Sequence, residues 1–189
     1  MATNYYREPL TKEELKEHSY DYKTGNPAVY VGTYGKYNDG SLKGEWIDLT
    51  TFCDYSDFLE FCERLHADEA DPELMFQDYE GFPRAYYGES HLDFDEIIEY
   101  SELSEDEQQA FDAYAENIGS SATIEGFREA YIGEFDSGAD FAEYYYTETG
   151  CFNTDELPDW VRNNIDWDGV FRDLVCDVWE NNGYYFWNH

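Results

Sequence analysis

The segment AVYVGTYGKYNDGSLKGEWIDL, residues 28–49, determines the fold of the N-terminal part of the chain. From Ala28 to Tyr34 the residues alternate in the manner of a half-buried strand. The turn sequence Asn38-Asp39-Gly40 follows, in which glycine supplies a positive φ. Apolar residues return in Ser41–Leu49, which we interpret as the partner strand. The segment therefore predicts a β-hairpin over 28–49.

Flanking patterns extend this hairpin into an α+β domain. Apolar residues at helical spacing predict a helix over Tyr55–Leu65, and we expect a third strand over Leu74–Tyr79. Upstream, Thr11 with Glu14 forms a capping-box pattern that predicts a short helix. We therefore expect an N-terminal extension over 1–26 and an N-terminal α+β domain with a three-stranded sheet over 27–86.

Three helix starts are predicted in the middle of the chain. Two have a capping-box pattern and one a capping threonine: Asp93 with Glu96, Ser104 with Glu107, and Thr123. The first two predict helices near 94–100 and 105–117. The third predicts a helix with Phe127, Ala130 and Tyr131 facing inward. We expect a small helical domain over 87–130.

The last third of the chain is again mixed and forms a third expected domain, 131–189. Ser137 predicts a helix start, and the helix ends near Glu148 with Gly150 at its C′ position. Its expected buried stripe is Phe141, Tyr144 and Tyr145. Further predicted elements are a short helix beginning at Pro158, a helix over 167–174 capped by Asp166, and a hairpin of Val175–Glu180 and Tyr184–Trp187 around an Asn-Gly turn.

The composition combines a very high charge with many rings. The chain of 189 residues has 44 Asp and Glu against 11 Lys and Arg, a formal net charge of −33, and 20% of its residues are aromatic. Disordered chains are poor in aromatic residues, so we expect a folded protein. A surface this acidic repels DNA, RNA and anionic membranes, which excludes direct binding to them. There is no apolar run of the roughly 18 residues that a membrane helix needs, and no secretory signal, so we expect a cytoplasmic protein.

The cysteines and histidines give no pattern for metal or redox chemistry. They include no CxxC pair and no zinc-ligand spacing: Cys53, Cys62, Cys151 and Cys176, and His18, His66, His91 and His189. We expect reduced thiols, with a disulfide as the alternative, and no metal and no cofactor.

Motifs of the common enzyme classes are absent from the sequence. GxSxG, the P-loop, GxGxxG and HExxH are not found. Asp93-Phe94-Asp95 begins like a calcium loop, but Ile98 and Ser104 stand where that loop needs Gly and Glu. Any two of 44 acids match the carboxylate pair of a glycosidase, so that pattern carries no information. We predict that the protein is not an enzyme.

The charge is concentrated in one part of the chain. Residues 1–43 have six basic and six acidic residues, whereas residues 44–189 have five basic and 38 acidic ones. Nine Asp/Glu pairs after Gly44 are four residues apart, a spacing that on a helix costs roughly 0.2–0.5 kcal/mol per pair. Solubility needs a net charge of only about 2–8. We infer that the acidic surface is itself functional, rather than an adaptation to high salt, which would place acids along the entire chain.

Sixteen acids are the candidate functional carboxylates. They lie in the middle and last thirds of the sequence: Asp93, Asp95, Glu96, Glu99, Glu102, Glu105, Asp106, Glu107, Asp112, Glu116, Glu125, Glu129, Asp136, Asp140, Asp173 and Asp177.

Four stretches in order resemble one family. Residues 29–46, VYVGTYGKYNDGSLKGEW, are similar to the opening pattern VYV…Y.KYN.G.L.G.W of the ArdA antirestriction proteins. FQDYEGFP (76–83), YYYTETG (144–150) with the later Pro158, and NIDW (164–167) with FRDL (171–174) resemble three further segments of that family. The resemblance covers about residues 28–189. Departures are the 26-residue extension, Thr147 in place of an acid, and Phe171 where the family usually has a small residue.

The resemblance implies a function and a site. It implies an elongated α+β protein of three small domains in a row that forms a homodimer through the third. It also implies a mimic of B-form DNA that occupies the DNA-binding groove of type I restriction-modification enzymes and protects incoming mobile elements. The segment from 144 to 158 matches the antirestriction motif, associated with the dimer contact: Tyr144, Tyr145, Glu148, Thr149, Gly150 and Pro158.

Charge arithmetic agrees with such mimicry. Duplex DNA has about one charge per 1.7 Å, so 33 charges match roughly 56 Å of duplex. A compact globule of this length would be only about 40 Å across. An elongated dimer would present the charge at the density of DNA. The alternative is an acidic binding module for another basic DNA-binding or histone-like protein.

Overall fold

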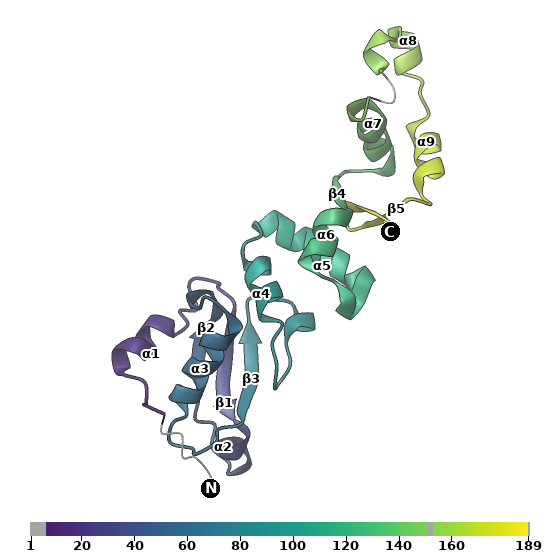
Figure 1. The fold of residues 1–189 in the computed structure, drawn as a ribbon. Coiled ribbons are helices and arrows are strands. Elements are labelled where there is room, and N and C mark those ends of the chain that lie inside the picture. Colours follow the sequence, from purple (N-terminus) through teal and green to yellow (C-terminus); the bar gives the residue numbers. More distant parts are fainter. Residues whose placement is uncertain (1–6, 151–152, 189) are drawn as a thin grey trace. The chain divides into compact units, whose positions relative to one another are not determined.

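The computed structural model describes residues 7–150 and 153–188. As predicted, the fold is α+β, with two separate three-stranded antiparallel sheets in these residues (Figure 1). The chain divides into two compact units, which we call the N-terminal unit (Met1–Gln108) and the C-terminal unit (Gln109–His189). The boundary falls within helix α5 (Glu105–Ile118). The division into three domains stays a prediction.

The sheet of the N-terminal unit has its first strand in the centre. Its strands are β1 (Ala28–Thr33), β2 (Glu45–Asp48) and β3 (Leu74–Glu80), in the order β2-β1-β3. The predicted pairing of the first two strands and the predicted third strand are both confirmed. A β-bulge between Tyr30 and Val31 shifts the register of β1 against β3.

The predicted hairpin is wrong between its two strands. Residues Tyr34–Asn38 form a short helix, α2, because the Thr33 side chain accepts a hydrogen bond from the Lys36 amide at 3.2 Å and starts a helical turn. Gly40, with φ 78°, then makes the turn that Asn38-Asp39-Gly40 predicts. The partner strand consequently begins at Glu45 and not at Ser41.

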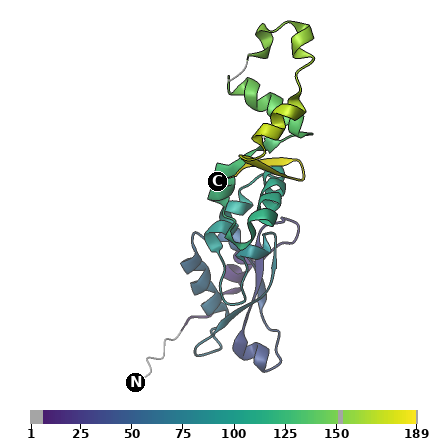
Figure 2. The same cartoon turned by 90° about the vertical axis from the view of Figure 1, so that its right-hand side faces the viewer.

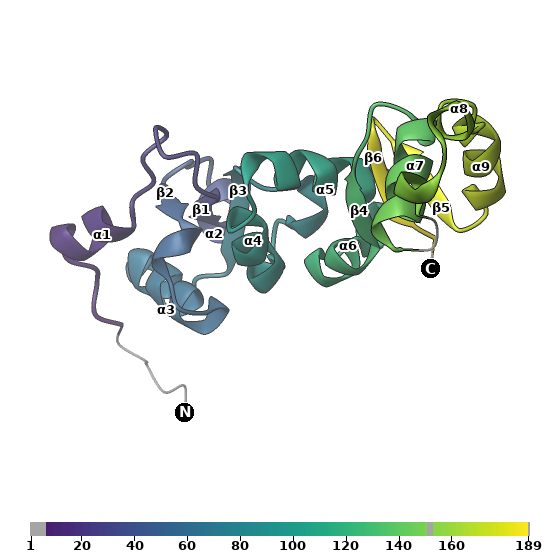
Figure 3. The same ribbon diagram turned by 90° about the horizontal axis from the view of Figure 1, so that it is seen from above.

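The two faces of this sheet differ. Helix α3 (Tyr55–Leu65) packs on one face, where the Phe58 and Phe76 rings are 5.7 Å apart and Val29 and Val31 are fully buried (Figure 3). The opposite face has Tyr30 of β1 beside Trp46 of β2, and both are only half-buried.

The N-terminal extension lies along the edge of β2. Helix α1 (Lys12–His18) begins with the predicted capping box of Thr11 and Glu14. The His18 ring stacks on Phe52 with centroids 4.4 Å apart. The Tyr20 amide then donates to the Trp46 carbonyl oxygen at 3.0 Å. The extension therefore satisfies part of the open strand edge.

The three helices predicted in the middle of the chain are present. They are α4 (Phe94–Ser101), α5 and α6 (Ile124–Ala130). Ser104 and Thr123 make the expected capping hydrogen bonds. Asp93 does not, because its side chain turns toward His91, with Oδ1 3.5 Å from Nε2. In the part of the chain that the structure describes, 3₁₀ turns also occur in the connections: η1 (Leu49–Thr51), η2 (Arg84–Tyr86), η3 (Gly119–Ser121) and η4 (Thr154–Glu156).

The sheet of the C-terminal unit contains a strand that the sequence did not predict. Its order is β4-β6-β5, with β4 (Tyr131–Glu134), β5 (Val178–Asn181) and β6 (Tyr184–Trp187). The predicted hairpin is confirmed, and Asn182 (φ 54°) and Gly183 (φ 86°) form its two-residue turn. However, β5 starts at Val178 rather than Val175, and Tyr131 begins β4 instead of facing a helical core.

This second sheet lies between two pairs of helices. On one face, Phe186 of β6 packs against Tyr114 of α5 and Phe127 of α6. On the other, Tyr185 contacts Phe141 and Phe171. These two residues come from α7 (Gly138–Glu148) and α9 (Trp167–Leu174), and Figure 2 shows both helices on one side of the sheet. Because successive strand residues point to opposite faces, these neighbours join both helix pairs to one strand.

Two features of the C-terminal helices concern the predicted core. Ser137 and Asp166 cap α7 and α9 as expected, and Pro158 directly precedes α8 (Asp159–Arg162). Phe141 is fully buried, but Tyr144 is 48% exposed, so the assignment of Tyr144 to the buried stripe is wrong.

In the described ranges, no helix has the length and apolarity to cross a membrane.

Candidate functional site

The sixteen candidate carboxylates lie almost entirely on the surface. Fourteen are exposed, and Glu96 and Glu99 on α4 are half-buried. Glu96 accepts a hydrogen bond from the Tyr86 hydroxyl at 3.3 Å. Helices α4, α5 and α6 with their flanking residues carry twelve of the sixteen.

The four-residue spacing does not always place two carboxylates on one helix. Asp95/Glu99, Asp112/Glu116 and Glu125/Glu129 each lie within a single helix. Asp136/Asp140 and Asp173/Asp177 do not, because Asp136 precedes the cap of α7 and Asp177 follows the end of α9. The expectation of repulsion within one helix is therefore wrong for these two pairs.

The middle of the chain contains no basic residue of the lysine or arginine type. Between Arg84 and Arg128 there are twelve acidic residues and no lysine or arginine. In contrast, ion pairs join Arg7 to Glu63, Arg64 to Glu14, and Lys43 to Asp68, all within residues 7–69. Acidic charge near the N-terminus is thus partly neutralised by the chain's own cations, and α4 and α5 lie in a stretch without them.

One cluster in the N-terminal unit resembles a metal site but binds a lysine. One ligand atom each of His66, Asp68 and Glu69 lies within 4.8 Å of the others. Lys36 Nζ lies 2.8 Å from His66 Nδ1, 2.8 Å from Asp68 Oδ1 and 3.0 Å from Glu69 Oε1. The ammonium group thus takes the place between these groups that a cation would need.

The pKa values in this cluster follow from its burial and from Lys36. Burial, and then the charge of Lys36, lowers the pKa of His66. The hydrogen bond from Lys36 is the largest cause that lowers the pKa of Asp68, to about 2. Burial raises the pKa of Glu69, but hydrogen bonds from Thr33 and Lys36 outweigh it and lower the pKa overall. The cluster therefore holds an ammonium group between a neutral imidazole and two carboxylates.

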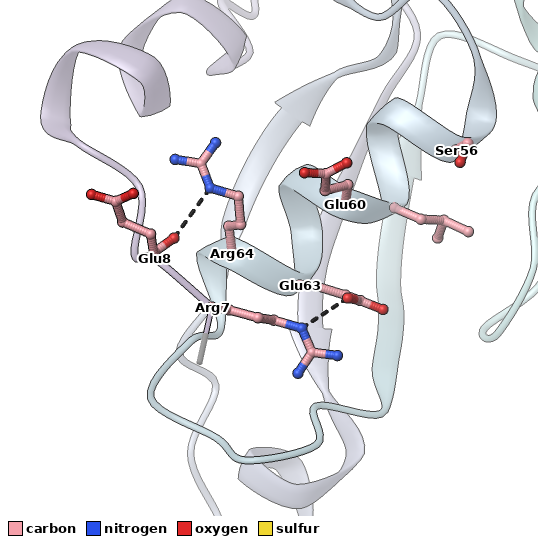
Figure 4. A pocket seen from close by; sticks show the side chains of 7 residues that line it. Arg7, Glu8, Ser56, Glu60, Glu63 and Arg64 are labelled. Atoms are coloured by element: carbon pink, nitrogen blue, oxygen red, sulfur yellow. Dashed lines mark hydrogen bonds and ion pairs between the residues drawn. The ribbon is translucent and has the colours of Figure 1, made fainter. Parts of the chain in front are cut away.

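A hollow in the N-terminal unit lies between the extension and α3. Its volume is about 840 Å³, and Arg7, Arg64, Glu60 and Glu63 line it with three other residues (Figure 4). Arg7 Nε donates to Glu63 at 2.8 Å and Arg64 Nε donates to the Glu8 carbonyl oxygen at 3.1 Å. These bonds fasten the extension to α3, so we assign the hollow a structural role.

The cysteines that the structure describes are free thiols. Cys53 and Cys176 are exposed and Cys62 is buried, and burial raises the pKa of Cys62. Cys151 lies outside the described residues.

The segment predicted as a dimer contact is placed partly on the surface. Tyr144, Glu148, Thr149, Gly150 and Pro158 are exposed, whereas Tyr145 is half-buried. Residues 151–152 of this segment lie outside the described residues. Sequence reasoning missed Trp160 on α8, which is 73% exposed and stands two residues after Pro158. A single tryptophan in a polar stretch gives no periodicity from which its exposure can be predicted.

Phe171, the bulky residue at a position where a small one is usual, is accommodated by a glycine. Gly138 lies at the start of α7, and a Cβ atom there would overlap the Phe171 ring. Phe171 packs at 6.1 Å from Phe141 and 6.0 Å from Tyr185, between centroids. The missing side chain of Gly138 provides the space for the ring.

Comparison with known families agrees with these observations. The family described as "Antirestriction protein (ArdA)" matches residues 29–186, which is most of the chain. No match was found among curated proteins. The matched region begins within β1 and ends within β6, so it spans both sheets but not the extension. The chain therefore belongs to the ArdA family of antirestriction proteins.

Proposed function

We propose that this protein inhibits type I restriction-modification enzymes in the cytoplasm by acting as an acidic mimic of B-form DNA. The carboxylates of α4, α5, α6 and the C-terminal unit stand in for phosphates and contact the Lys and Arg residues of the enzyme's DNA-binding groove. Inhibition is competitive, because DNA and the mimic need the same groove. It requires no catalytic group in this chain.

The observation that supports this proposal best is the stretch between Arg84 and Arg128. Twelve acidic residues without a lysine or arginine place only negative formal charge from Lys, Arg, Asp and Glu on α4 and α5. On helices, lysines four residues from these acids would add stability, so stability alone does not favour this composition. A binding surface for a strongly basic partner does favour it.

The mechanism has a recognisable electrostatic signature. Many partly exposed charges act together at long range, so association is fast at low salt and weakens as salt screens them. No single carboxylate is indispensable, because each exposed ion pair contributes only about 0–1 kcal/mol.

The proposal includes a homodimer through the C-terminal unit. Tyr144, the first residue of the segment associated with the dimer contact, is 48% exposed, and Trp160, two residues after that segment, is 73% exposed. Exposed aromatic side chains are typical anchors of protein interfaces. Sedimentation of Trp160→Ser should show a shift toward monomer. Leu42→Ser, which removes a 68% exposed apolar residue of the N-terminal unit, should leave the dimer intact.

A competition titration tests the function. A type I methyltransferase core is bound to labelled cognate duplex, the purified protein is added, and DNA release is followed at two salt concentrations. We expect release at near-stoichiometric dimer, weaker at the higher salt. Absence of release at low salt would contradict the proposal. Tight binding to a histone-like protein in the same buffer would then favour the acidic-module alternative.

A further inference from the structure

The face of the N-terminal sheet opposite α3 has a hollow of about 470 Å³, which we call the sheet hollow. Trp46, Tyr30 and Asp78 pair across β2, β1 and β3 and form one row on this face. In the next row Gly32 pairs with Met75. Because Gly32 has no side chain, the sheet surface is recessed there, with the Gln77 side chain lying over it.

Aromatic rings form one side of the sheet hollow. The Tyr30 and Trp46 rings are 5.8 Å apart and nearly perpendicular, at 67°. The Tyr30 hydroxyl donates to the Leu42 carbonyl oxygen at 2.8 Å, which fixes the loop before β2 over the strand. Leu42 and Tyr37 line the hollow as well and are 68% and 50% exposed.

The charges at the sheet hollow have one sign. Asp78 and Glu89 are exposed carboxylates that line it, and its lining contains no basic residue. The two lysines of the connection between β1 and β2 are held elsewhere, since Lys36 Nζ and Lys43 Nζ contact Asp68 at 2.8 and 3.1 Å. The hollow therefore combines aromatic surface with two exposed carboxylates and no basic residue.

We propose that the sheet hollow binds the guanidinium group of an arginine from a partner protein. A guanidinium is planar, so it stacks on Tyr and Trp rings while its N–H groups donate to carboxylates. An ammonium group has the charge but cannot stack, and an uncharged ligand leaves Asp78 and Glu89 without a counter-charge. The identity of the partner rests on the proposed function, because DNA-binding grooves are rich in arginine.

A peptide titration tests the site itself. The probe is the acetylated and amidated peptide Gly-Arg-Gly, and the signal is the Trp46 indole N–H resonance, assigned with Trp46→Phe. We expect a saturable shift of this resonance. The same peptide with citrulline, which keeps the shape but not the charge, should cause no shift. A lysine peptide should bind more weakly. Equal binding of the citrulline or lysine peptide would overturn the assignment.

A charge-matched pair of variants separates the site from the overall charge. Asp78→Asn with Glu89→Gln should weaken binding of the arginine peptide roughly tenfold, because two exposed ion pairs are lost. Asp57→Asn with Glu60→Gln removes the same charge from exposed positions of α3 and should leave binding unchanged. Equal effects of the two variants would contradict a specific site.

Peptide binding and DNA displacement, measured on the same protein, distinguish this proposal from the proposed function. If the peptide fails to bind while the protein displaces DNA from the methyltransferase core, the sheet hollow is wrong and the function stands. If the peptide binds but no DNA is displaced, the hollow stands and the partner is a different arginine-rich protein.

Discussion

The ammonium nitrogen of Lys36 lies 2.8 Å from Nδ1 of His66. An ammonium group only donates hydrogen bonds, so Nδ1 must be unprotonated and Nε2 must have the proton. Nε2 then donates to the Val31 carbonyl oxygen at 3.3 Å. This neutral imidazole connects α2, the central strand and the loop after α3.

Removing Lys36 should therefore destabilise the N-terminal unit. Lys36→Met leaves Asp68, Glu69 and a buried imidazole nitrogen without their shared donor, and we expect a loss of about 1–3 kcal/mol in urea unfolding at neutral pH. Lys43→Met is the control, because the Lys43 side chain is 66% exposed and binds the same Asp68. Lys43→Met should lower the free energy of unfolding by less than about 0.5 kcal/mol. Equal losses would mean that only the charge of Asp68 matters.

His66 should make stability depend on pH in a defined direction. Its pKa in the folded protein is below the ordinary value of 6.5 because of burial and Lys36. Near this pH, His66 therefore binds a proton more readily in the unfolded chain than in the folded one. The free energy of unfolding consequently falls as pH decreases below about 6.5. His66→Gln should flatten the slope of unfolding free energy against pH in this range. An unchanged slope would assign the dependence to other groups.

Gly138 and Phe171 should be energetically coupled. Gly138→Ala places a methyl group against the Phe171 ring and should destabilise the C-terminal unit by about 1–3 kcal/mol. In a Phe171→Ala background the same change should be neutral or stabilising, since alanine is the better helix former. A double-mutant cycle from thermal unfolding measures this reversal. Additive effects would show that the ring does not need the glycine.

Inhibition should depend on the number of carboxylates changed. Asp112→Lys should weaken displacement of DNA only slightly. Reversing Asp95, Glu102, Glu105 and Asp106 together should abolish it while circular dichroism shows an intact fold. The control reverses Asp57, Glu60, Asp71 and Glu73, four exposed acids that precede Arg84, and gives a variant of the same net charge. Equal losses would contradict the chosen surface, and loss from one neutralised acid with the dimer intact would contradict distributed mimicry.

Local signals predicted much of this fold because capping involves residues only three apart. Five predicted caps are made as expected: Thr11, Ser104, Thr123, Ser137 and Asp166. The missed strand β4 pairs with β6, and Glu134 lies opposite Tyr184, fifty residues later. Nothing in the residues around Tyr131 reveals so distant a partner.

The candidate site was predictable in its charge but not in its shape. Exposure of the carboxylates follows from their chemistry, since charged side chains are rarely fully buried. The sheet hollow depends on which residues meet across three strands, and the bulge between Tyr30 and Val31 sets that register. Alternation along β1 places Tyr30 away from α3, but no sequence pattern shows that this second face stays open.

The central position of β6 determines when the second sheet can form during synthesis. All three strands of the first sheet are present once the ribosome has passed Glu80. The second sheet must wait for Tyr184, because β4 and β5 both pair with β6. Until then β4 lacks its partner strand. The rings that pack on Phe186 and Tyr185 in the folded protein likewise lack these contacts. A nascent chain stalled before β6 would therefore have a finished N-terminal sheet and an open, chaperone-accessible second half.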